Sequence, residues 1–349
     1  MIRERLTAQL MAGPPARDPV VVVERLLAVQ GQDARGARLA IRARSAGLTA
    51  ADVDRAMTED RSLLITWLNR GTLHLVARDD YPWLHTLTTP PLITGSARRL
   101  AQEGVTPDAA ERAVEVIARS LAEEGPLTRY QLRARVETAG VRGEGQALVH
   151  LLALASHRGL IVRGPMVGKQ HAYVLVRDWL GEVKPVPRER ALHELARRFL
   201  VGHGPADARD LAKWSGLPLR DARAGLDAIA RDLDVRPDGL VNLAGRASAA
   251  EPAPPRLLGP FDPLLMGWTS RAAILARHDA AVVTGGIFRP FALVGGRGVA
   301  TWRLSSGRVE IEPFARVSRA DRVALSVDAE DVVRFLAAAK TSSTRHIPD

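Results

Sequence analysis

Cysteine is absent from this chain of 349 residues. Its absence excludes disulfides, thiolate metal sites and a cysteine nucleophile together. Long apolar runs are also missing, since none approaches the roughly 18 consecutive apolar residues that a membrane helix needs. The first six residues, MIRERL, lack the apolar stretch of a secretory signal. We therefore expect a cytoplasmic protein without a membrane partner.

Lysine is scarce, with four among the 49 basic residues, and the remainder are arginines. Codon usage in a GC-rich genome explains part of this bias, but it does not explain the formal net charge of +10. Arginine makes forked contacts to phosphate oxygens and base edges. A basic surface suits a polyanion, and composition therefore favours nucleic acid as the partner.

The motifs of several common enzyme classes are missing as well. No Gly-x-x-x-x-Gly-Lys phosphate loop and no Gly-x-Ser-x-Gly nucleophile elbow occur. The nine histidines are scattered, and none forms a pair at the four-residue spacing of a helical zinc site. The sequence therefore predicts neither a bound metal nor a cofactor.

A weak internal repeat organises the middle of the chain. Each copy starts with Gly-Pro, and a polar residue, Thr128 or Asp207, is placed to cap the first helix. A second helix is expected in each copy, over 146–157 and 217–231, followed by two short β-runs that form a hairpin. Two helices and a two-stranded wing are the elements of a winged helix-turn-helix unit.

The two ends of the chain differ from each other. The N-terminal part holds a possible third copy, with helices predicted over 50–57 and 62–69 and a strand over 71–76. In the C-terminal part, three alternating runs joined by glycine turns between 286 and 314 predict an antiparallel sheet. Residues 328–339 are expected to form a closing amphipathic helix.

Proline-rich segments at 182–187 and 248–255 separate these parts. We predict an α+β chain of tandem winged-helix units with a C-terminal antiparallel β-rich part, arranged in a C shape around DNA. The predicted domains are an N-terminal winged-helix unit, a second and a third unit, and the C-terminal part, at 1–115, 116–183, 188–247 and 256–349.

Winged helices serve as DNA-binding or as protein-interaction modules. Arginines in the second helices and hairpins favour DNA, namely Arg158, Arg163, Arg220 and Arg223. Two or three units in one chain can hold a duplex without dimerising, so we expect a monomer rather than a repressor that needs two half-sites. A sequence-specific transcriptional regulator without chemistry is the alternative.

Two glutamines stand close together near the N-terminus. Gln30 and Gln32 fall between a helical run over 20–29 and a second one over 34–44. Residues two apart in an extended segment point to the same side, whereas on a helix they diverge. Two convergent amides can hold one water between them. The alternative is that the glutamines cap helix ends or face solvent.

The sequence resembles the winged-helix DNA glycosylases of the AlkZ and AlkX type over nearly its whole length. The resemblance rests on five segments in order, at 27–33 (LAVQGQD), 66–76 (TWLNRGTLHLV), 261–268 (FDPLLMGW), 286–290 (GIFRP) and 301–303 (TWR). It implies a catalytic Gln-x-Gln motif, carried here by Gln30 and Gln32. Family members place an aliphatic residue between the glutamines, and this chain has Gly31.

The resemblance implies a monofunctional glycosylase for bulky or cross-linked N7-alkylpurines in duplex DNA, used in genotoxin self-resistance or repair. Alkylation at N7 makes the purine a good leaving group, so positioning a water remains the main task. A lesion-binding relative without catalysis is the alternative. The candidate DNA-binding residues are Arg35, Arg38, Arg70, Thr72, His74, Arg289 and Arg303.

Overall fold

A six-stranded antiparallel sheet lies at the centre of the N-terminal half in the computed structural model, which describes residues 1–168, 170–184, 186–246 and 252–337. Its strand order is β1-β3-β2-β5-β6-β4. The strands are β1 (Val29–Gln30), β2 (Leu63–Leu68), β3 (Thr72–Ala77), β4 (Leu127–Thr128), β5 (Ile161–Val167) and β6 (Gln170–Leu175). Because β2 pairs with β5 at Ile65 and Arg163, the sheet joins the first predicted unit to the second.

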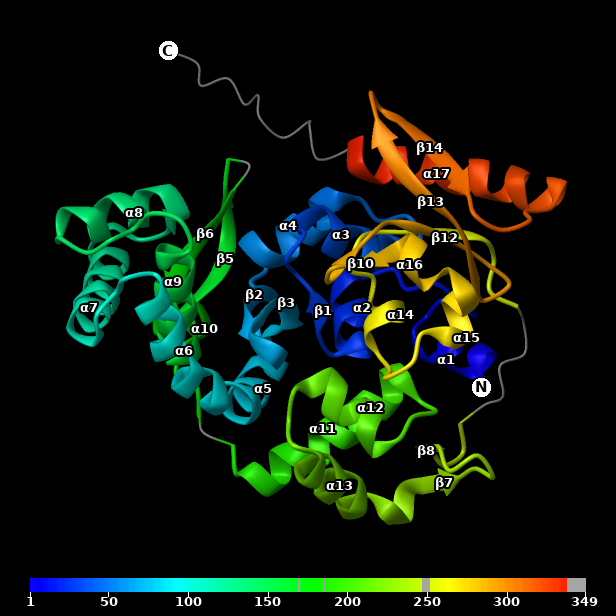
Figure 1. The fold of residues 1–349 in the computed structure, drawn as a ribbon, viewed down its shortest axis with the longest axis horizontal. Coiled ribbons are helices and arrows are strands. Elements are labelled where there is room, and N and C mark those ends of the chain that lie inside the picture. The colour runs from blue at the N-terminus through cyan, green and yellow to red at the C-terminus, as the bar shows by residue number, and fades with distance from the viewer. Residues whose placement is uncertain (169, 185, 247–251, 338–349) are drawn as a thin grey trace.

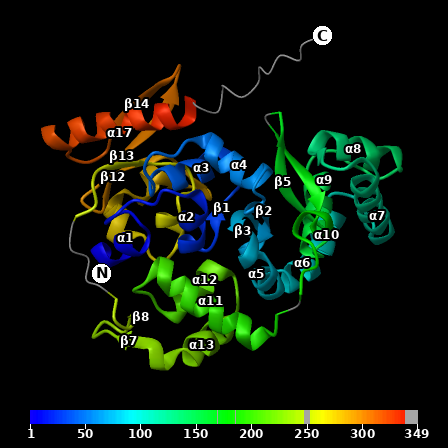
Figure 2. The ribbon, with the colours of Figure 1, turned by 180° about the vertical axis from the view of Figure 1, so that it is seen from behind.

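The helices of the first 180 residues lie around this sheet (Figure 1). They are α1 (Ile2–Ala8), α2 (Pro19–Leu26), α3 (Ala34–Arg42), α4 (Ala50–Thr58), α5 (Tyr81–Thr88), α6 (Pro90–Gln102), α7 (Pro107–Glu124), α8 (Arg129–Thr138), α9 (Ala147–His157) and α10 (Val176–Leu180). Helix α6 packs against α9, and α9 contacts both β2 and β5. Figures 1 and 2 show the β5–β6 hairpin beside α8 and α9 from opposite sides.

The helix predicted over 62–69 is wrong, because these residues form strand β2 and the start of a short 3₁₀ turn, η1 (Asn69–Gly71). All residues of β2 are buried. A short apolar run that is buried on both sides has no period that distinguishes a strand from a helix. The predicted boundary at 115/116 falls inside α7, and the division into winged-helix units stays a prediction.

The predicted pattern of two helices and a hairpin is confirmed in the middle part. The two helices are α12 (Ala208–Ser215) and α13 (Leu219–Ala228), and the hairpin consists of β7 (Leu233–Val235) and β8 (Val241–Leu243). Helix α11 (Arg188–His203) precedes them. The two predicted caps are also confirmed. Asp207 accepts from the Asp210 amide at 2.8 Å, and Thr128 accepts from the Gln131 amide at 3.4 Å.

The C-terminal part forms the predicted antiparallel sheet, with strand order β14-β13-β12-β9. Its elements are β9 (Arg256–Leu258), α14 (Pro263–Met266), α15 (Ala272–Leu275), α16 (Asp279–Val282), β10 (Val283–Thr284), β11 (Ile287–Phe288), β12 (Phe291–Val294), β13 (Arg297–Ser305), β14 (Arg308–Pro313) and α17 (Arg319–Ala337). Pro290 lies between β11 and β12, and β11 pairs with β10 instead of joining the larger sheet. The closing helix begins at Arg319, earlier than predicted, and residues 338–339 of that prediction lie outside the described residues.

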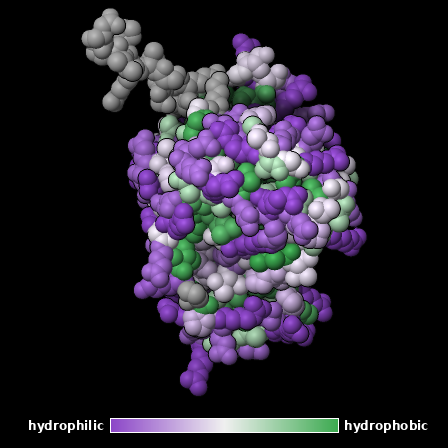
Figure 3. All heavy atoms as spheres, turned by 90° about the vertical axis from the view of Figure 1, so that its left-hand side faces the viewer, coloured by the Kyte–Doolittle hydropathy of each residue, from purple (hydrophilic) through white to green (hydrophobic). Residues whose placement is uncertain are grey.

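No helix of the described residues is long and apolar enough to cross a membrane. Seen from the side of α7 and α8, the surface is mainly hydrophilic, with smaller hydrophobic areas between the polar residues (Figure 3). The C shape around DNA stays a prediction.

Candidate active site

The Gln30–Gln32 segment is held against strand β3. Gln30 ends the two-residue strand β1 and pairs with His74, and the Gly31 amide donates to the Leu73 carbonyl at 2.7 Å. The segment then turns into α3, whose N-terminus is capped by Asp33. Gln30 thus lies in extended chain and Gln32 in the bend before α3, between two helices as the sequence predicts, and strand pairing fixes the register of Gln30.

The two glutamine side chains converge, which confirms the expectation from their spacing. The Gln30 amide nitrogen, Nε2, donates to Oε1 of Gln32 at 2.8 Å. Oε1 of Gln30 accepts from the Thr72 hydroxyl at 3.4 Å. Gln30 is buried and Gln32 is exposed. Gln30 therefore orients Gln32, and Gln32 is the member of the pair that is open to a ligand.

A cavity of about 390 Å³ lies beside Gln32. It is enclosed by the end of β2, the η1 turn, and the facing sides of α6 and α9. Its volume is in the range of small-molecule sites. The lining residues are Gln32, Trp67, Arg70, Gly71, Pro91, Leu92, Gly95, Ser96, Arg99, Val149, His150, Ala153 and His157.

The arginines of this cavity differ in how firmly they are held. The Arg70 guanidinium donates to the carbonyls of Lys213, at 3.3 Å, and of Trp214, both on α12. Burial lowers the pKa of Arg70. Arg99 is exposed and has no ion pair or side-chain hydrogen bond within the described residues. Arg70 is thus fixed by the middle part of the chain, whereas Arg99 is available to a phosphate.

The histidines around the site are neutral. Burial, together with the nearby Arg70, lowers the pKa of His74 to about 3. Because the Thr72 carbonyl can only accept, Nδ1 of the neutral ring carries the proton and donates to it at 2.9 Å. Burial likewise lowers the pKa of His157 to about 4, with a smaller contribution from His85. The buried Nε2 of His157 has no hydrogen-bond partner within the described residues.

A buried asparagine shares the Thr72 hydroxyl with Gln30. Asn69 is fully buried, and neither polar atom of its side chain has a partner within the described residues. The Asn69 carbonyl accepts from the same Thr72 hydroxyl that contacts Gln30. Buried polar groups in folded proteins are normally hydrogen-bonded, so the side chain of Asn69 departs from this rule.

The other predicted DNA-binding residues are spread over the molecule and do not line this cavity. Arg38 is half-buried, and its Nε donates to Asp54 at 2.8 Å. Arg35 and Arg289 are exposed, and Arg303 donates to Glu310 at 2.7 Å. Thr72 bonds to the Gln30 side chain, and His74 pairs with Gln30 between β3 and β1. Both residues thus hold Gln30 in place and do not form an open surface. A DNA contact by any of these residues stays a prediction.

Sequence reasoning did not find several residues of the cavity. Trp67 was assigned to a helix, and Arg99, His150 and His157 lie on α6 and α9, far along the chain from Gln32. No motif connects these segments. The tertiary structure brings them to the glutamines, since α6 packs on α9 and α9 contacts β2 and β5.

Comparison with known proteins gives consistent matches. The family model described as "DNA glycosylase AlkZ-like" matches residues 23–335. A curated relative, the "Interstrand DNA cross-link repair glycosylase" of Streptomyces sahachiroi, is 28% identical over 92% of this chain and 91% of its own length. The solved structure of Streptomyces sahachiroi DNA glycosylase AlkZ superposes with a TM-score of 0.78 at 25% identity, covering 96% of this chain and 95% of that one. The chain belongs to the AlkZ-like DNA glycosylase family.

Proposed function

We propose that this DNA glycosylase hydrolyses the N-glycosidic bond of bulky or cross-linked N7-alkylpurines in duplex DNA. The observation that carries the proposal is the hydrogen-bonded pair of Gln30 and Gln32 at the edge of a ligand-sized cavity. The printed name of the Streptomyces relative, a cross-link repair glycosylase, supports the substrate class.

Gln32 is the residue that we expect to orient the water. Its Oε1 accepts one hydrogen bond from Gln30 and retains a second acceptor position. A water that donates there presents its oxygen to C1′ of the damaged nucleotide. Gln30, held by Thr72, acts as a positioning residue that sets the direction of the Gln32 amide.

The reaction is a substitution at C1′. The water oxygen forms a bond to C1′, the C1′–N9 bond breaks, and its electron pair neutralises the cationic purine. The proton that the water loses goes to solvent. A neutral amide stabilises an oxocarbenium-like transition state less than a carboxylate does, so we expect selectivity for bases that alkylation has already activated.

The proposal includes an abasic product in an intact strand. Strand cleavage needs an amine that forms a Schiff base at C1′. Of the described lysines, Lys184 and Lys213, neither lines the cavity, and the Lys213 ammonium donates to the Thr269 carbonyl. We further propose that the enzyme acts as a monomer in the cytoplasm and protects its host against a DNA-alkylating compound.

Release of N7-methylguanine, or of a bulkier N7 adduct, from duplex DNA tests the proposal. Gln32→Ala should slow release by about two to four orders of magnitude, and Gln30→Ala should also slow it, with DNA binding nearly unchanged. Gln102→Ala, at an exposed glutamine on α6, is the matched control. Wild-type rates in both single variants, or a wild type that binds DNA and excises no adduct, would contradict the proposal.

A further inference from the structure

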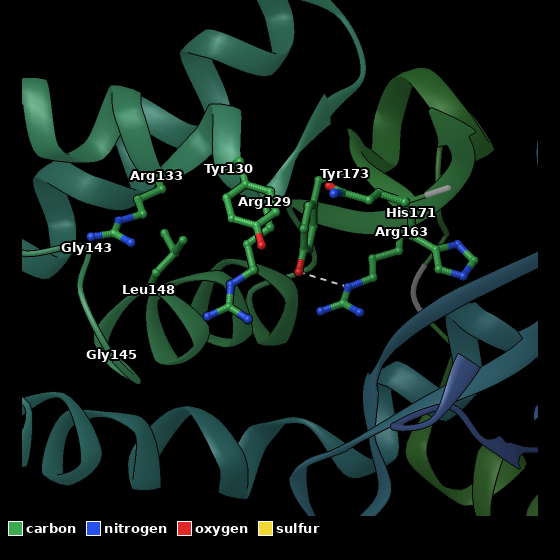
Figure 4. A pocket seen from close by; sticks show the side chains of 10 residues that line it. Arg129, Tyr130, Arg133, Gly143, Gly145, Leu148, Arg163, His171 and Tyr173 are labelled. Atoms are coloured by element: carbon green, nitrogen blue, oxygen red, sulfur yellow. Dashed lines mark hydrogen bonds between the residues drawn. The ribbon is translucent and has the colours of Figure 1, made fainter. Parts of the chain in front are cut away.

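A second cavity, of about 560 Å³, lies between α8 and the β5–β6 hairpin. Figure 4 shows that its residues come from the first half of α8, the loop between α8 and α9, the start of α9 and the two hairpin strands. The lining residues are Arg129, Tyr130, Arg133, Gly143, Gly145, Leu148, Arg163, Gln170, His171 and Tyr173. None of them belongs to the Gln30–Gln32 motif.

Two arginines in this cavity have no acidic partner. Within the described residues, the Arg129 side chain makes no hydrogen bond or ion pair, and Arg163 bonds only to the Tyr173 hydroxyl, at 2.8 Å. Figure 4 shows their guanidinium groups on either side of that hydroxyl. Arg133, by contrast, is paired with Glu137 at 2.6 Å. Arg129 and Arg163 thus form a concentration of uncompensated positive charge.

The Arg163 guanidinium is held in place by two aromatic rings. It lies 5.0 Å from the ring centre of Trp67 and 5.0 Å from that of Tyr173. The two rings themselves are 6.4 Å apart and nearly parallel. A guanidinium fixed in this way loses little freedom when it binds a phosphate. Arg163 is therefore in position before any ligand binds.

An exposed aromatic ring completes the cavity. The Tyr130 side chain is 70% exposed, which is unusual for a large aromatic residue. It extends from α8 over the cavity next to Arg129 (Figure 4). Aromatic rings beside a basic groove are the features by which proteins hold unpaired bases, because every base has a face that stacks.

The second cavity adjoins the first, because residues of the same elements line both. Trp67 lines the cavity at Gln32 and also contacts Arg163 of the second one. At the start of α9, Leu148 lines the second cavity, while Val149 and His150 line the first. The two cavities are therefore close enough for one bound DNA to contact both.

We propose that this cavity binds an unpaired nucleotide of the same DNA, with its base stacked on Tyr130 and its phosphate between Arg129 and Arg163. The inference rests on the proposed function only in that DNA occupies the cavity at Gln32. The role of this second cavity is to hold a nucleotide that has lost its base-pairing partner, so that the distorted duplex stays open beside the lesion.

Binding of undamaged DNA tests this site without any excision. Two labelled duplexes are compared by fluorescence anisotropy, one fully paired and one with a single unpaired nucleotide. The wild type should prefer the second duplex, and Tyr130→Ala should reduce that preference by about five- to 150-fold, the range measured for base–aromatic stacking. Arg129→Gln should also weaken binding of the second duplex more than that of the first.

Arg177→Gln is the matched control and should bind both duplexes like the wild type. The Arg177 side chain is 73% exposed and forms an ion pair with its neighbour Asp178. Gln32→Ala should keep the preference, so the result does not depend on whether the protein excises bases. Equal binding of the two duplexes by the wild type, or an equal loss for both in Tyr130→Ala, would overturn the proposal.

Discussion

At the scale of single residues, the sequence predicts which side chains meet but not how they share their roles. The spacing of Gln30 and Gln32 predicts convergence, because extended chain has a period of two. The difference between them follows from strand pairing instead. Gln30 is buried because β1 lies against β3, and Thr72 on β3 reaches its amide. A contact between residues 42 positions apart leaves no local signal in one sequence.

Gly31 provides a test at the same scale. Its φ is not in the left-handed region, and an added Cβ would be 3.4 Å from backbone atoms of Leu73, His74 and Leu75, an ordinary contact distance. The backbone here therefore does not require glycine. We expect Gly31→Ala to fold and to excise at a rate within about threefold of the wild type, a change below about 1 kcal/mol in barrier height.

Rates of release by Gly31→Ala and by the wild type on the same duplex check this expectation, with thermal unfolding as the control for folding. A loss of activity comparable to that of Gln32→Ala would mean that the glutamine pair needs freedom in the backbone at this position.

At the scale of elements, the sequence predicts helices that have caps and strands that have turns, and it fails where burial is complete. Thr128 and Asp207 mark helix starts by a local hydrogen bond, so their helices were found. Strand β2 has no alternation, because both of its faces are covered. The segment that contains Phe261 and Asp262 carries part of the family resemblance, and the structure explains what Asp262 does.

Asp262 joins the C-terminal part to the N-terminal half. Its carboxylate accepts from the two terminal nitrogens of Arg44, at 2.8 and 2.9 Å, and from the Leu264 amide at 2.9 Å. Both side chains of the ion pair are fully buried. Asp262→Asn leaves the Arg44 charge buried and uncompensated, so we expect a loss of about 3–5 kcal/mol in the free energy of unfolding.

Urea unfolding of Asp262→Asn and of Glu310→Gln compares this pair with an exposed one. Glu310 forms an ion pair with Arg303, whose side chain is 77% exposed. Glu310→Gln should therefore lower the free energy of unfolding by less than about 1 kcal/mol. Similar losses in the two variants would show that the buried pair contributes no more than the surface pair.

At the scale of the whole molecule, the order of the parts is predictable and their association is not. The proline-rich segments indicate where the chain leaves one part for the next. They do not indicate that strands from two predicted units form one sheet, or that Arg70 of the first part is held by α12 of the third. Association of this kind depends on complementary surfaces, and a single sequence shows these only as apolar residues without an assigned partner.

The association also buries histidines. His203 of α11 is fully buried, stacks on Phe199 and is covered by Trp214 and Trp268. Burial lowers its pKa to about 3, with smaller contributions from arginines. The same cause lowers the pKa of His74 and His171 to about 3 and that of His157 to about 4. In the unfolded chain these imidazoles titrate near 6.5.

A dependence of stability on pH follows from these shifts. Between pH 6.5 and the folded values, the unfolded chain binds protons that the folded chain does not, so acid favours unfolding. The stabilisation is complete above about pH 6.5 and is lost as the pH falls toward 4 for His157 and toward 3 for the other three. Each histidine contributes at most about 1.4 kcal/mol per pH unit. Carboxyl groups with lowered pKa, such as Glu4 and Asp331, add their own loss only below about pH 4.5.

We therefore expect the free energy of unfolding, measured in urea, to fall steeply from pH 6.5 to pH 5. His203→Gln removes one of the titrating groups and should make this fall shallower by about 1 kcal/mol per pH unit. The slope is the informative quantity, because the substitution also changes packing against Phe199 by an amount that does not vary with pH. A wild type equally stable at pH 7 and pH 5, or an unchanged slope in His203→Gln, would mean that the buried imidazole of His203 takes up its proton without opening the aromatic cluster around it.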